Sequence, residues 1–419
     1  MIHSLKYILI AGALTTPALM FAESLLVTDS PQARQSMTWN SPTAINAAPD
    51  FLIIGKSDRF YVGVGGNVTL TASFDPGRSM SNPNEFITSE IPMGKTPGNN
   101  GTFSFSAQQT QLYLNMVAFP SSKNRVGGFV GINFLGNNYL PELVYAYIRW
   151  RGLQAGYDYN LFSDSEAIPP SIDYEGANAI TAQGTAGVRY SLNFGKRKEW
   201  CAQIGAELPM LSPTQSVMNE KNFTEPVTQK VPDIPVALQY SWESGAHIRL
   251  SGVLRNLYSR SVAENKNIDH LGWGIQLSGS GEILPGLTAY SQIVYGKGIA
   301  SYFQDLNGLG LDMVPSPSGR NLSTVRCWGA YGALQYAFSD KFSVVGTYSQ
   351  VRSYPDEYPD GEAPFQSQYR YAQYAAGTFY YNITSNLTSG IEYIWGKRVD
   401  CNGEKGVASR IQAALIFSF

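Results

Sequence analysis

RIQAALIFSF, the stretch from Arg410 to Phe419, ends the chain on an aromatic residue. Its side chains alternate, and one face of the extended strand that they predict is wholly apolar, with Ile411, Ala413, Leu415, Phe417 and Phe419. The other face is mostly polar, with Arg410, Gln412, Ala414 and Ser418. Such a strand is typical of the end of an outer-membrane β-barrel, where it closes against the first strand and its last aromatic residue joins the interfacial girdle. We therefore predict that Phe419 lies at the closure of a barrel.

The same two-residue alternation begins at Phe60 and recurs to the end of the chain, interrupted by clusters of Gly, Pro, Asn and Asp. We predict strands at 60–74, 102–118, 125–134, 142–150, 153–159, 181–194, 199–208, 234–243, 246–256, 270–280, 286–296, 323–338, 341–352, 367–382, 386–397 and 407–419. The predicted fold is therefore all-β: a transmembrane antiparallel barrel of about sixteen strands, apolar outside and polar inside.

The connections between these strands alternate in length. Short ones such as SSKN, GKRK and LPG separate long ones near 75–101, 160–180, 209–233, 257–269, 297–322 and 353–366. Periplasmic turns and external loops of bacterial barrels alternate in this way. A soluble β-sandwich also alternates polar and apolar residues, but it would not keep long and short connections in this order through so many hairpins.

The N-terminus predicts export. Lys6 precedes an apolar run that ends at Ala22, and we expect residues 1–22 to be a signal peptide, with cleavage after Ala22 or after Ala18. Residues 23–54 are polar and rich in proline, which indicates an N-terminal arm, and residues 55–419 form the barrel. After residue 22 the sequence contains no run of 18 or more apolar residues, so no membrane-spanning helix is expected. The expected location is the outer membrane of a Gram-negative cell, with its lipid as one partner.

Composition excludes several other classes. Thirty Lys and Arg against 32 Asp and Glu give a net charge of −2, which does not indicate a nucleic-acid partner. Three histidines leave little for a histidine metal site, and no cofactor is expected. Three cysteines allow at most one disulfide within the chain, and Cys327 with Cys401 is the preferred pair because both fall near one end of the predicted barrel.

The loop from Asn160 to Ala179 is the predicted constriction. It carries two adjacent prolines and four acids, Asp164, Glu166, Asp173 and Glu175. A connection of this length is usually functional or disordered. In a barrel of this size, the third external loop can fold inward and place its carboxylates against the opposite wall. The alternative is a solvated, acidic surface loop. Whether the loop lies inside or outside the bore separates these two hypotheses.

Arginines on the predicted inner face would form the pore wall: Arg189, Arg249, Arg255, Arg370 and Arg410. Guanidinium groups stay charged and bind carboxylates or phosphates through two parallel hydrogen bonds. Opposite an acidic loop they would create a transverse field that favours small anions or zwitterions. The alternative is that each arginine pairs with a wall carboxylate such as Glu207 or Glu392. Arg149 and Arg151 are interpreted as charges of the periplasmic rim.

Catalytic patterns are nearly absent. His247 and Ser251 are the best pair, but both share a face with Arg249, which we interpret as the inner one, and no G-x-S-x-G elbow is present. We therefore predict that the protein is not an enzyme. A barrel whose long external loops bind a surface partner remains as a different class of function.

Three segments resemble the DcaP-like family of trimeric outer-membrane porins: DFLIIGKSDRFYVGVGGNVTLTASFD (50–75), FSFSAQQTQLYL (103–114) and, most specifically, GYDYNLFSDSEAIPPSIDYEGAN (156–178). The resemblance implies a homotrimer of 16-stranded barrels, each with its own pore for small anionic solutes such as dicarboxylates. Where the family tends to carry arginines in the second strand, this chain has Gln108 and Gln111 on the wall, which weakens the expectation of strong anion selectivity. The arm lacks the heptads of a coiled coil, so a trimer would rest on barrel contacts.

Together these patterns predict a passive outer-membrane diffusion channel for small hydrophilic solutes that favours small anionic or zwitterionic ones. The alternatives within transport are a non-selective general porin and a phosphate-type anion porin.

Overall fold

The computed structural model describes residues 26–27, 52–55, 60–94, 101–209, 224–225, 228–262, 264–315, 322–355 and 368–419. The predicted signal peptide and most of the predicted arm lie outside these residues. No helix within the described ranges is long and apolar enough to cross a membrane.

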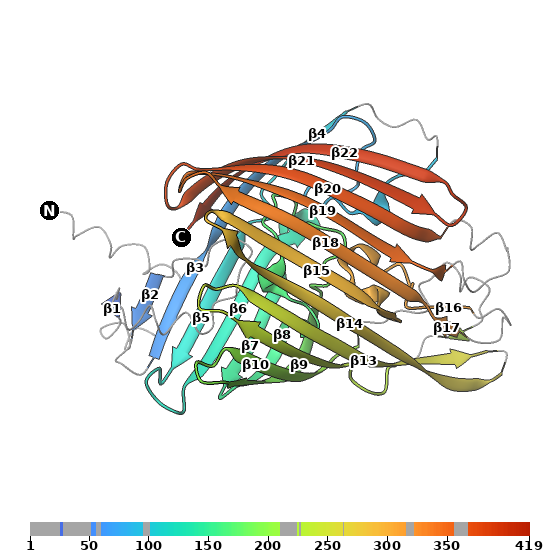
Figure 1. Ribbon diagram of the computed structural model, residues 1–419, viewed down its shortest axis with the longest axis horizontal. Coiled ribbons are helices and arrows are strands. Elements are labelled where there is room, and N and C mark those ends of the chain that lie inside the picture. The colour runs from blue at the N-terminus through green and yellow to red at the C-terminus, as the bar shows by residue number, and fades with distance from the viewer. Residues whose placement is uncertain are drawn as a thin grey trace.

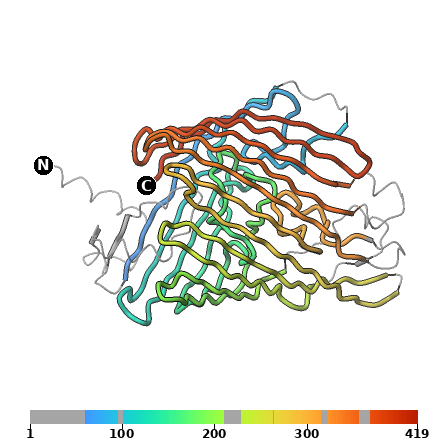
Figure 2. Tube along the Cα trace, in the orientation of Figure 1, coloured from blue at the N-terminus to red at the C-terminus, as the bar shows by residue number. Residues whose placement is uncertain are grey.

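Sixteen antiparallel strands form one closed barrel with tilted strands (Figures 1 and 2). In order they are β3 (Phe60–Asp75), β4 (Thr102–Ser106) with β5 (Gln111–Ala118) as one interrupted strand, β6 (Val126–Gly136), β7 (Leu140–Trp150), β8 (Leu153–Tyr159), β9 (Gly184–Phe194), β10 (Trp200–Glu207), β12 (Ile234–Ser241), β13 (His247–Ser261), β14 (Lys266–Leu284), β15 (Leu287–Lys297), β18 (Arg326–Ala337), β19 (Phe342–Ser353), β20 (Tyr369–Asn382), β21 (Leu387–Asp400) and β22 (Lys405–Ser418).

Several short elements are not among the sixteen barrel strands. They are β1 (Leu26–Val27), β2 (Leu52–Gly55), β11 (Thr224–Glu225), β16 (Met313–Pro315), β17 (Leu322–Thr324) and the 3-10 turns η2 (Thr88–Glu90), η3 (Asn137–Tyr139), η4 (Ser165–Ala167), η7 (Ala300–Tyr302) and η8 (Gln304–Leu306). β2 pairs with the start of β3.

The last strand closes the barrel, as its sequence predicts. β22 pairs with β3 from Ile411 opposite Phe74 to Ser418 opposite Asn67. Phe419 then exchanges two backbone hydrogen bonds with Gly66, each 3.0 Å long. The main-chain donors and acceptors of the first and last strands thus satisfy one another, which a strand bordering lipid requires.

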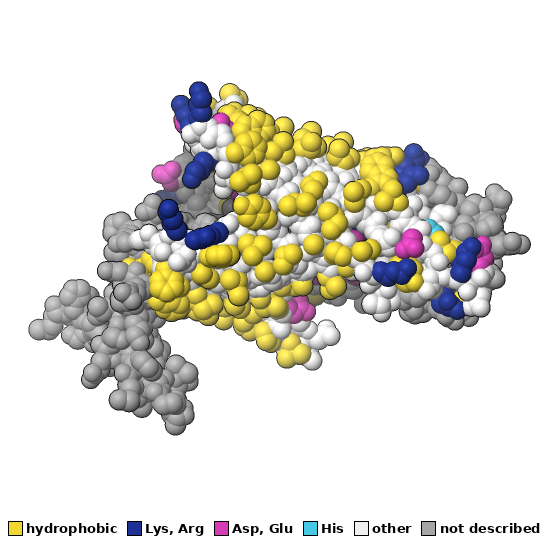
Figure 3. Space-filling view, turned by 90° about the horizontal axis from the view of Figure 1, so that it is seen from below, with side chains coloured by type: hydrophobic (Ala, Val, Ile, Leu, Met, Phe, Trp, Pro, Cys, Tyr) yellow, Lys and Arg dark blue, Asp and Glu magenta, His cyan; other side chains and the backbone are white. Residues whose placement is uncertain are grey.

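The two faces of the wall have opposite character. On β14, Leu271, Ile275 and Leu277 are exposed to the outside, whereas Gln276 and Ser278 are buried inside. Large apolar side chains repeat this outward pattern on neighbouring strands, and Figure 3 shows them as a belt between margins that carry charged side chains. A belt of this kind matches the hydrocarbon layer of a membrane.

One predicted loop is wrong. Residues 257–269 were expected to form a long connection, but β13 and β14 continue their pairing through this range to Ser261 opposite Lys266. Polar side chains interrupt the apolar pattern here because the hairpin extends beyond the apolar belt. Solvated side chains do not prevent the backbone ladder from continuing.

The preferred cysteine pair is also wrong, since Cys201, Cys327 and Cys401 are all free. Cys327 lies on β18 and Cys401 follows β21, with β19 and β20 between them. Three strand spacings of about 4.8 Å separate the two positions by roughly 14 Å. A disulfide needs Cα atoms within about 7 Å of each other.

A second core lies inside the barrel. Phe162 and Ile180, from the connection between β8 and β9, pack with Ile299 and Phe303 from the connection between β15 and β18. All four side chains are buried. We call these connections the third loop (160–183) and the sixth loop (described residues 298–315), and the connection from β3 to β4 the first loop (described residues 76–94). The bore is therefore filled mainly by loops.

The orientation of β13 gives a test of the lipid-facing surface. Leu250 is outward, 48% exposed, and lies between Leu238 and Leu277 of the adjacent strands. Leu250→Arg is expected to lower the free energy of unfolding in phospholipid vesicles by about 2–4 kcal/mol, the cost of arginine near the bilayer midplane. Leu250→Ala is the control for lost packing. Equal losses in the two variants, measured by denaturant titration, would contradict a lipid-facing position.

Candidate functional site

The third loop lies inside the bore rather than on the surface. Asn160 closes its base, because the amide Nδ2 donates to the carbonyl of Thr181 at 2.7 Å and to that of Gln183 at 3.0 Å. A 3-10 turn, η4, then carries the chain across the interior. Most of the loop is buried, including Asp164, Ile172 and Asn178. The hypothesis of a solvated surface loop is therefore wrong.

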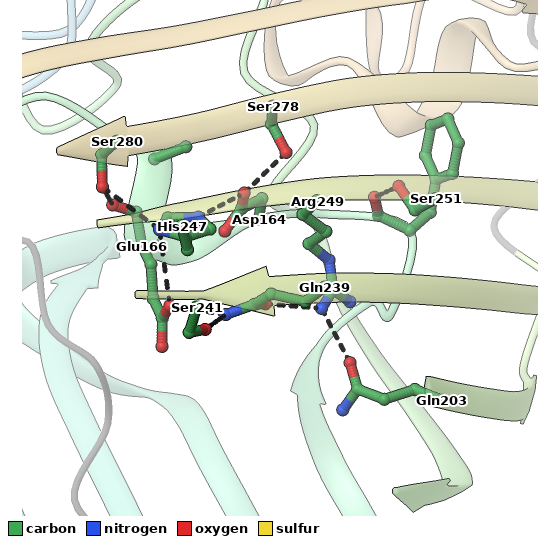
Figure 4. A network of polar contacts seen from close by, with 12 residues as sticks. Asp164, Glu166, Gln203, Gln239, Ser241, His247, Arg249, Ser251, Ser278 and Ser280 are labelled. Carbon is green, nitrogen blue, oxygen red and sulfur yellow. Dashed lines mark hydrogen bonds and ion pairs between the residues drawn. The ribbon is translucent and has the colours of Figure 1, made fainter. Parts of the chain in front are cut away.

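One side of the loop is attached to β13 and β14 (Figure 4). Asp164 Oδ2 lies 2.9 Å from His247 Nε2 and accepts a hydrogen bond of 2.6 Å from Ser278. Ser251 donates to the carbonyl of Phe162 at 2.6 Å. Burial alone would raise the pKa of Asp164, but the hydrogen bond and charge of His247 and the hydroxyl of Ser278 keep this pKa below its usual value. The carboxylate therefore stays charged at the attachment point.

The other side is attached to β21 by one carboxylate. Glu392 accepts hydrogen bonds from the Ser171 hydroxyl at 3.0 Å, from the Ile172 amide at 3.2 Å and from the Asp173 amide at 2.9 Å. Asp173 in turn accepts from Tyr374 of β20 at 3.1 Å. The buried glutamate therefore both holds the loop and satisfies part of its main chain, and the Ser171 hydroxyl also accepts from the Asp173 amide at 3.1 Å.

Further contacts come from the strands between these two attachments. Gln292 of β15 donates to the carbonyl of Ala179 at 2.8 Å, and Tyr331 of β18 donates to that of Ala167 at 3.1 Å. Ser349 of β19 donates to the side chain of Asn178 at 2.7 Å. The loop thus spans the bore and is held from strands on many sides.

The first and sixth loops join this interior structure. Asp305 of the sixth loop accepts hydrogen bonds of 2.8 Å from both the Thr88 hydroxyl and the Ser89 amide of the first loop. Arg255 of β13 holds the sixth loop through a hydrogen bond of 2.6 Å to the carbonyl of Gly298 and an ion pair of 3.3 Å with Asp312. The roles of Asp305 and Arg255 could not be assigned from sequence spacing, because their partners are far from them in the chain.

Two cavities adjoin the third loop. The larger, about 360 Å³, reaches the turn between β9 and β10, and we call it the vestibule. Its charged lining residues are Arg149, Asp158, Asp164, Glu166, Arg189, Lys198, Glu199 and Arg249. The smaller, about 130 Å³, lies against β3, β5 and β22, and we call it the wall cavity. Tyr145, Tyr159 and Ser165 line both cavities, so the two meet at these residues.

The four predicted loop acids divide between these cavities. Asp164 and Glu166 line the vestibule, and Asp173 and Glu175 line the wall cavity. Glu166 is the most accessible of the four and accepts a hydrogen bond of 3.1 Å from Gln239. Burial raises the pKa of Asp173 to about 7, assisted by the nearby charge of Glu392. Burial also raises the pKa of Glu175, with the charge of Glu85 as the next cause.

The predicted wall arginines have different positions. Arg189 and Arg249 line the vestibule, and Arg189 forms an ion pair of 2.6 Å with Asp158. Arg255 is fully buried against Asp233, 2.9 Å away. Arg410 is 1% exposed and binds both oxygens of Asp75, at 2.8 and 3.1 Å. Arg370 is half-buried at a register shift of β20. Of the five, Arg189 and Arg249 line the vestibule, and none is among the described residues that line the wall cavity.

The two wall glutamines support the loops. Gln108, between β4 and β5, accepts a hydrogen bond of 2.7 Å from Asn84 of the first loop. Gln111 lines the wall cavity and donates to the hydroxyl of Tyr174 at 3.4 Å.

Sequence reasoning missed three features of the site. His247 and Ser251 were weighed only as a catalytic pair, yet they hold the third loop to the wall. Arg149 was interpreted only as a rim charge, and its place in the lining of the vestibule, with the guanidinium over the ring of Tyr147, was not foreseen. The inward fold of the sixth loop was also missed. Its apolar run at 299–303 (IASYF) was the available signal, because exposed loops rarely carry such a run.

The attachment to β21 generates a prediction. Glu392→Gln keeps the size of the side chain but removes its charge and one acceptor, so the hydrogen bonds to the amides of Ile172 and Asp173 should weaken. Amide hydrogen exchange at these two residues is expected to accelerate by about tenfold or more, because hydrogen bonds to charged groups contribute about 1.5–3 kcal/mol. Glu404→Gln, at an exposed position after β21, is the control. Unchanged exchange in Glu392→Gln would refute the anchoring role.

Comparisons with known proteins agree with this architecture. The family described as "Porin subfamily" matches residues 78–414. The outer membrane channel DcaP of Acinetobacter baumannii has a similar structure, with a TM-score of 0.72 at 17% identity, over 87% of this chain and 98% of that one. An anion-selective porin from Comamonas acidovorans gives a TM-score of 0.53 at 10% identity, over 86% of this chain and all of that one.

A search of curated protein sequences gave no significant match. The similarity to DcaP confirms, at the level of the fold, the family resemblance predicted from the sequence. The porin match extends from the first loop into the last strand, and the fold is a closed barrel of sixteen strands. The chain therefore belongs to the porin family, as an outer-membrane β-barrel channel rather than an enzyme.

Proposed function

We propose that this porin conducts small hydrophilic solutes passively and favours small anions, which it attracts into the vestibule. The observation that carries the proposal is the environment of Arg249. Its three hydrogen bonds go to uncharged oxygens: Gln203 Oε1 at 2.7 Å, Gln239 Oε1 at 3.2 Å and the carbonyl of Leu161 at 2.9 Å (Figure 4). The guanidinium is oriented by these bonds, and none of them neutralises its charge.

The charged lining of the vestibule is balanced in number, with four bases and the four acids Asp158, Asp164, Glu166 and Glu199. Asp158 is paired with Arg189, and Asp164 is paired with His247. The local charge of Arg249, rather than a net charge of the vestibule, therefore supports the anion preference. Dicarboxylates fit this proposal because a guanidinium binds a carboxylate through two parallel hydrogen bonds. One relative of similar fold is described as an anion-selective porin.

A weakly selective general porin is the second candidate, and a specific observation favours it. Arg189, Arg255 and Arg410 each form an ion pair with an aspartate, so the transverse field expected from a row of unpaired arginines is reduced. Gln108 and Gln111 add no charge. The two candidates differ in the size of the anion preference, which a reversal potential measures. A phosphate-type porin would show the same sign with preference for phosphate over dicarboxylates.

Assembly and location complete the proposal. We propose a homotrimer that forms through barrel contacts, as the resemblance to DcaP-like channels implies. The apolar belt supports contact with outer-membrane lipid. The inward position of the third loop favours a channel over a platform for a surface partner, because this loop is not presented to the outside.

Neutralising Arg249 gives the direct test. In a planar bilayer under a salt gradient, Arg249→Gln is expected to shift the reversal potential toward cations. The permeability ratio of anions to cations should fall by about threefold, because a unit charge about 7 Å from a permeating ion in water contributes about 0.6 kcal/mol. Single-channel conductance should change little.

Arg197→Gln is the matched control, because Arg197 lies in the exposed turn between β9 and β10 and its side chain is 74% exposed. This variant should keep the reversal potential of the original protein. An unshifted reversal potential in Arg249→Gln would reject the anion vestibule and favour the general porin. Absence of conductance in the unmodified protein would reject the channel itself.

Asp173 predicts a pH dependence of the open channel. Its pKa is raised to about 7 by burial and by Glu392, so the packed loop favours the neutral carboxyl over the charged one. The resulting stabilisation is present below the usual pKa of about 4 and is lost as the pH rises through 7. Current fluctuations of the open channel are therefore expected to increase between pH 5 and pH 8.

Asp173→Asn mimics the neutral form and should reduce this dependence. Asp340→Asn, in an exposed turn at the end of β18, should retain it. The same pH dependence in Asp173→Asn and in the unmodified protein would show that this carboxyl does not control the loop.

A further inference from the structure

Among the residues that the structure describes, two acidic side chains and no basic one line the wall cavity. Asp173 and Glu175 line it, and none of the described residues around it is Lys, Arg or His. Its volume of about 130 Å³ is close to that of cavities that hold a small organic molecule such as benzene. The ionisable groups of its lining are therefore acidic, whereas Arg249 in the vestibule is basic.

Glu175 is the central residue of this cavity. It is 8% exposed, and its Oε1 atom has no hydrogen-bond partner. A buried carboxylate oxygen without a donor is energetically unfavourable, and native structures rarely retain one without a ligand or a function. The charges around Glu175 are mainly acidic, with Glu85 and Glu90 of the first loop, Asp173 of its own loop and Asp305 of the sixth loop.

A second unpaired acceptor belongs to a residue that lines the same cavity. Gln304, the first residue of η8, lines the wall cavity, and its Oε1 atom is buried without a hydrogen-bond partner. The backbone amide of Gln304 donates to the carbonyl of Ile180 at 2.9 Å, which fixes the sixth loop beside the third. Two oxygens from different loops thus lack a donor at one cavity.

Aromatic rings complete the lining. Tyr113, Tyr145, Tyr159 and Tyr174 all line the wall cavity. A glycine leaves room for two of these rings, because a Cβ atom at Gly131 would lie 2.7 Å from Tyr145 and 2.9 Å from Tyr113. The faces of tyrosine rings attract organic cations. A divalent metal instead prefers several carboxylate ligands, and among the described residues no group of three or more His, Cys, Asp or Glu side chains could hold one.

We propose that the wall cavity binds the ammonium group of a small organic cation, with Glu175 Oε1 and Gln304 Oε1 as acceptors and the tyrosines as its aromatic wall. An alkylammonium group has three N–H donors, which supply the partners that both oxygens lack. This proposal rests on the proposed channel function in one respect, because the ligand reaches the cavity from solution through the channel. A solute that carries both an ammonium and a carboxylate group would then find complementary charge on either side of Tyr145 and Tyr159.

Calorimetry on the purified full-length protein in detergent tests the site without depending on conductance. Titration with n-butylammonium chloride at pH 8 is expected to show saturable binding to the unmodified protein. Glu175→Gln should weaken this binding by about tenfold or more, the scale of one charge-assisted hydrogen bond. Gln304→Leu should weaken it by less, because a neutral acceptor is lost.

Glu166→Gln is the matched control, because it removes an acid from the same loop on the vestibule side. Its affinity for n-butylammonium should stay within about twofold of the original. Equal affinities in Glu175→Gln and the unmodified protein, or no saturable binding at all, would overturn the site. Binding of magnesium chloride but not of n-butylammonium would overturn the assignment to an ammonium group.

Competition with protons gives an independent readout. Glu175 must lose its proton to bind a cation, and its pKa is raised by burial and by the surrounding acids. Arg398 and Arg410, whose charges act on Asp305 and Asp173, form ion pairs with Asp400 and Asp75. Affinity for n-butylammonium should therefore increase from pH 5 to pH 8 in the unmodified protein and increase less in Glu175→Gln, where Asp173 still titrates over this range. Current block by n-butylammonium in bilayers would separately show that the site lies on the conduction path.

Discussion

Every backbone N–H and C=O that borders lipid must be satisfied within the wall, and this constraint determines the rest of the molecule. It requires the sheet to close, which the pairing of β22 with β3 and the two hydrogen bonds between Phe419 and Gly66 achieve. Closure sends alternate side chains inward, where they form a polar surface. That surface can then hold loops, and the third loop is attached to it through Glu392, Ser251 and Arg249.

The barrel could be predicted because the two-residue alternation is visible within each strand, and because a shift of strand register would be energetically costly. A one-residue slip on β14 would move Gln276 and Ser278 into lipid and the outward leucines into the bore. The alternation in the sequence is therefore compatible with only one register of this strand. The position of the third loop was predicted from its length and its acids. Its attachments were not, because they join residues far apart: Asp164 and His247 are 83 positions apart, and Ser171 and Glu392 are 221 apart. No periodicity encodes such contacts.

Charge was the least predictable feature of the bore. The sequence identified the arginines, but it could not show that Arg410 binds Asp75 while Arg249 binds only uncharged oxygens. Whether an arginine forms an ion pair or lines a cavity depends on whether an aspartate lies close to it. The packing of loops from distant parts of the chain determines this. Arg255 shows this dependence, since Asp233 and Asp312, with which it forms ion pairs, come from connections rather than strands. The selectivity of the channel is consequently a property of loop packing.

The wall recognises the third loop largely by its main chain. Glu392 accepts from the amides of Ile172 and Asp173, while Arg249, Ser251, Tyr331 and Gln292 donate to the carbonyls of Leu161, Phe162, Ala167 and Ala179. Every residue other than proline offers the same amide and carbonyl, so these attachments tolerate substitution of the side chains between them. The loop can therefore acquire a new set of side chains while it keeps its path. Such a scaffold allows evolution, or an engineer, to change what passes without rebuilding the channel.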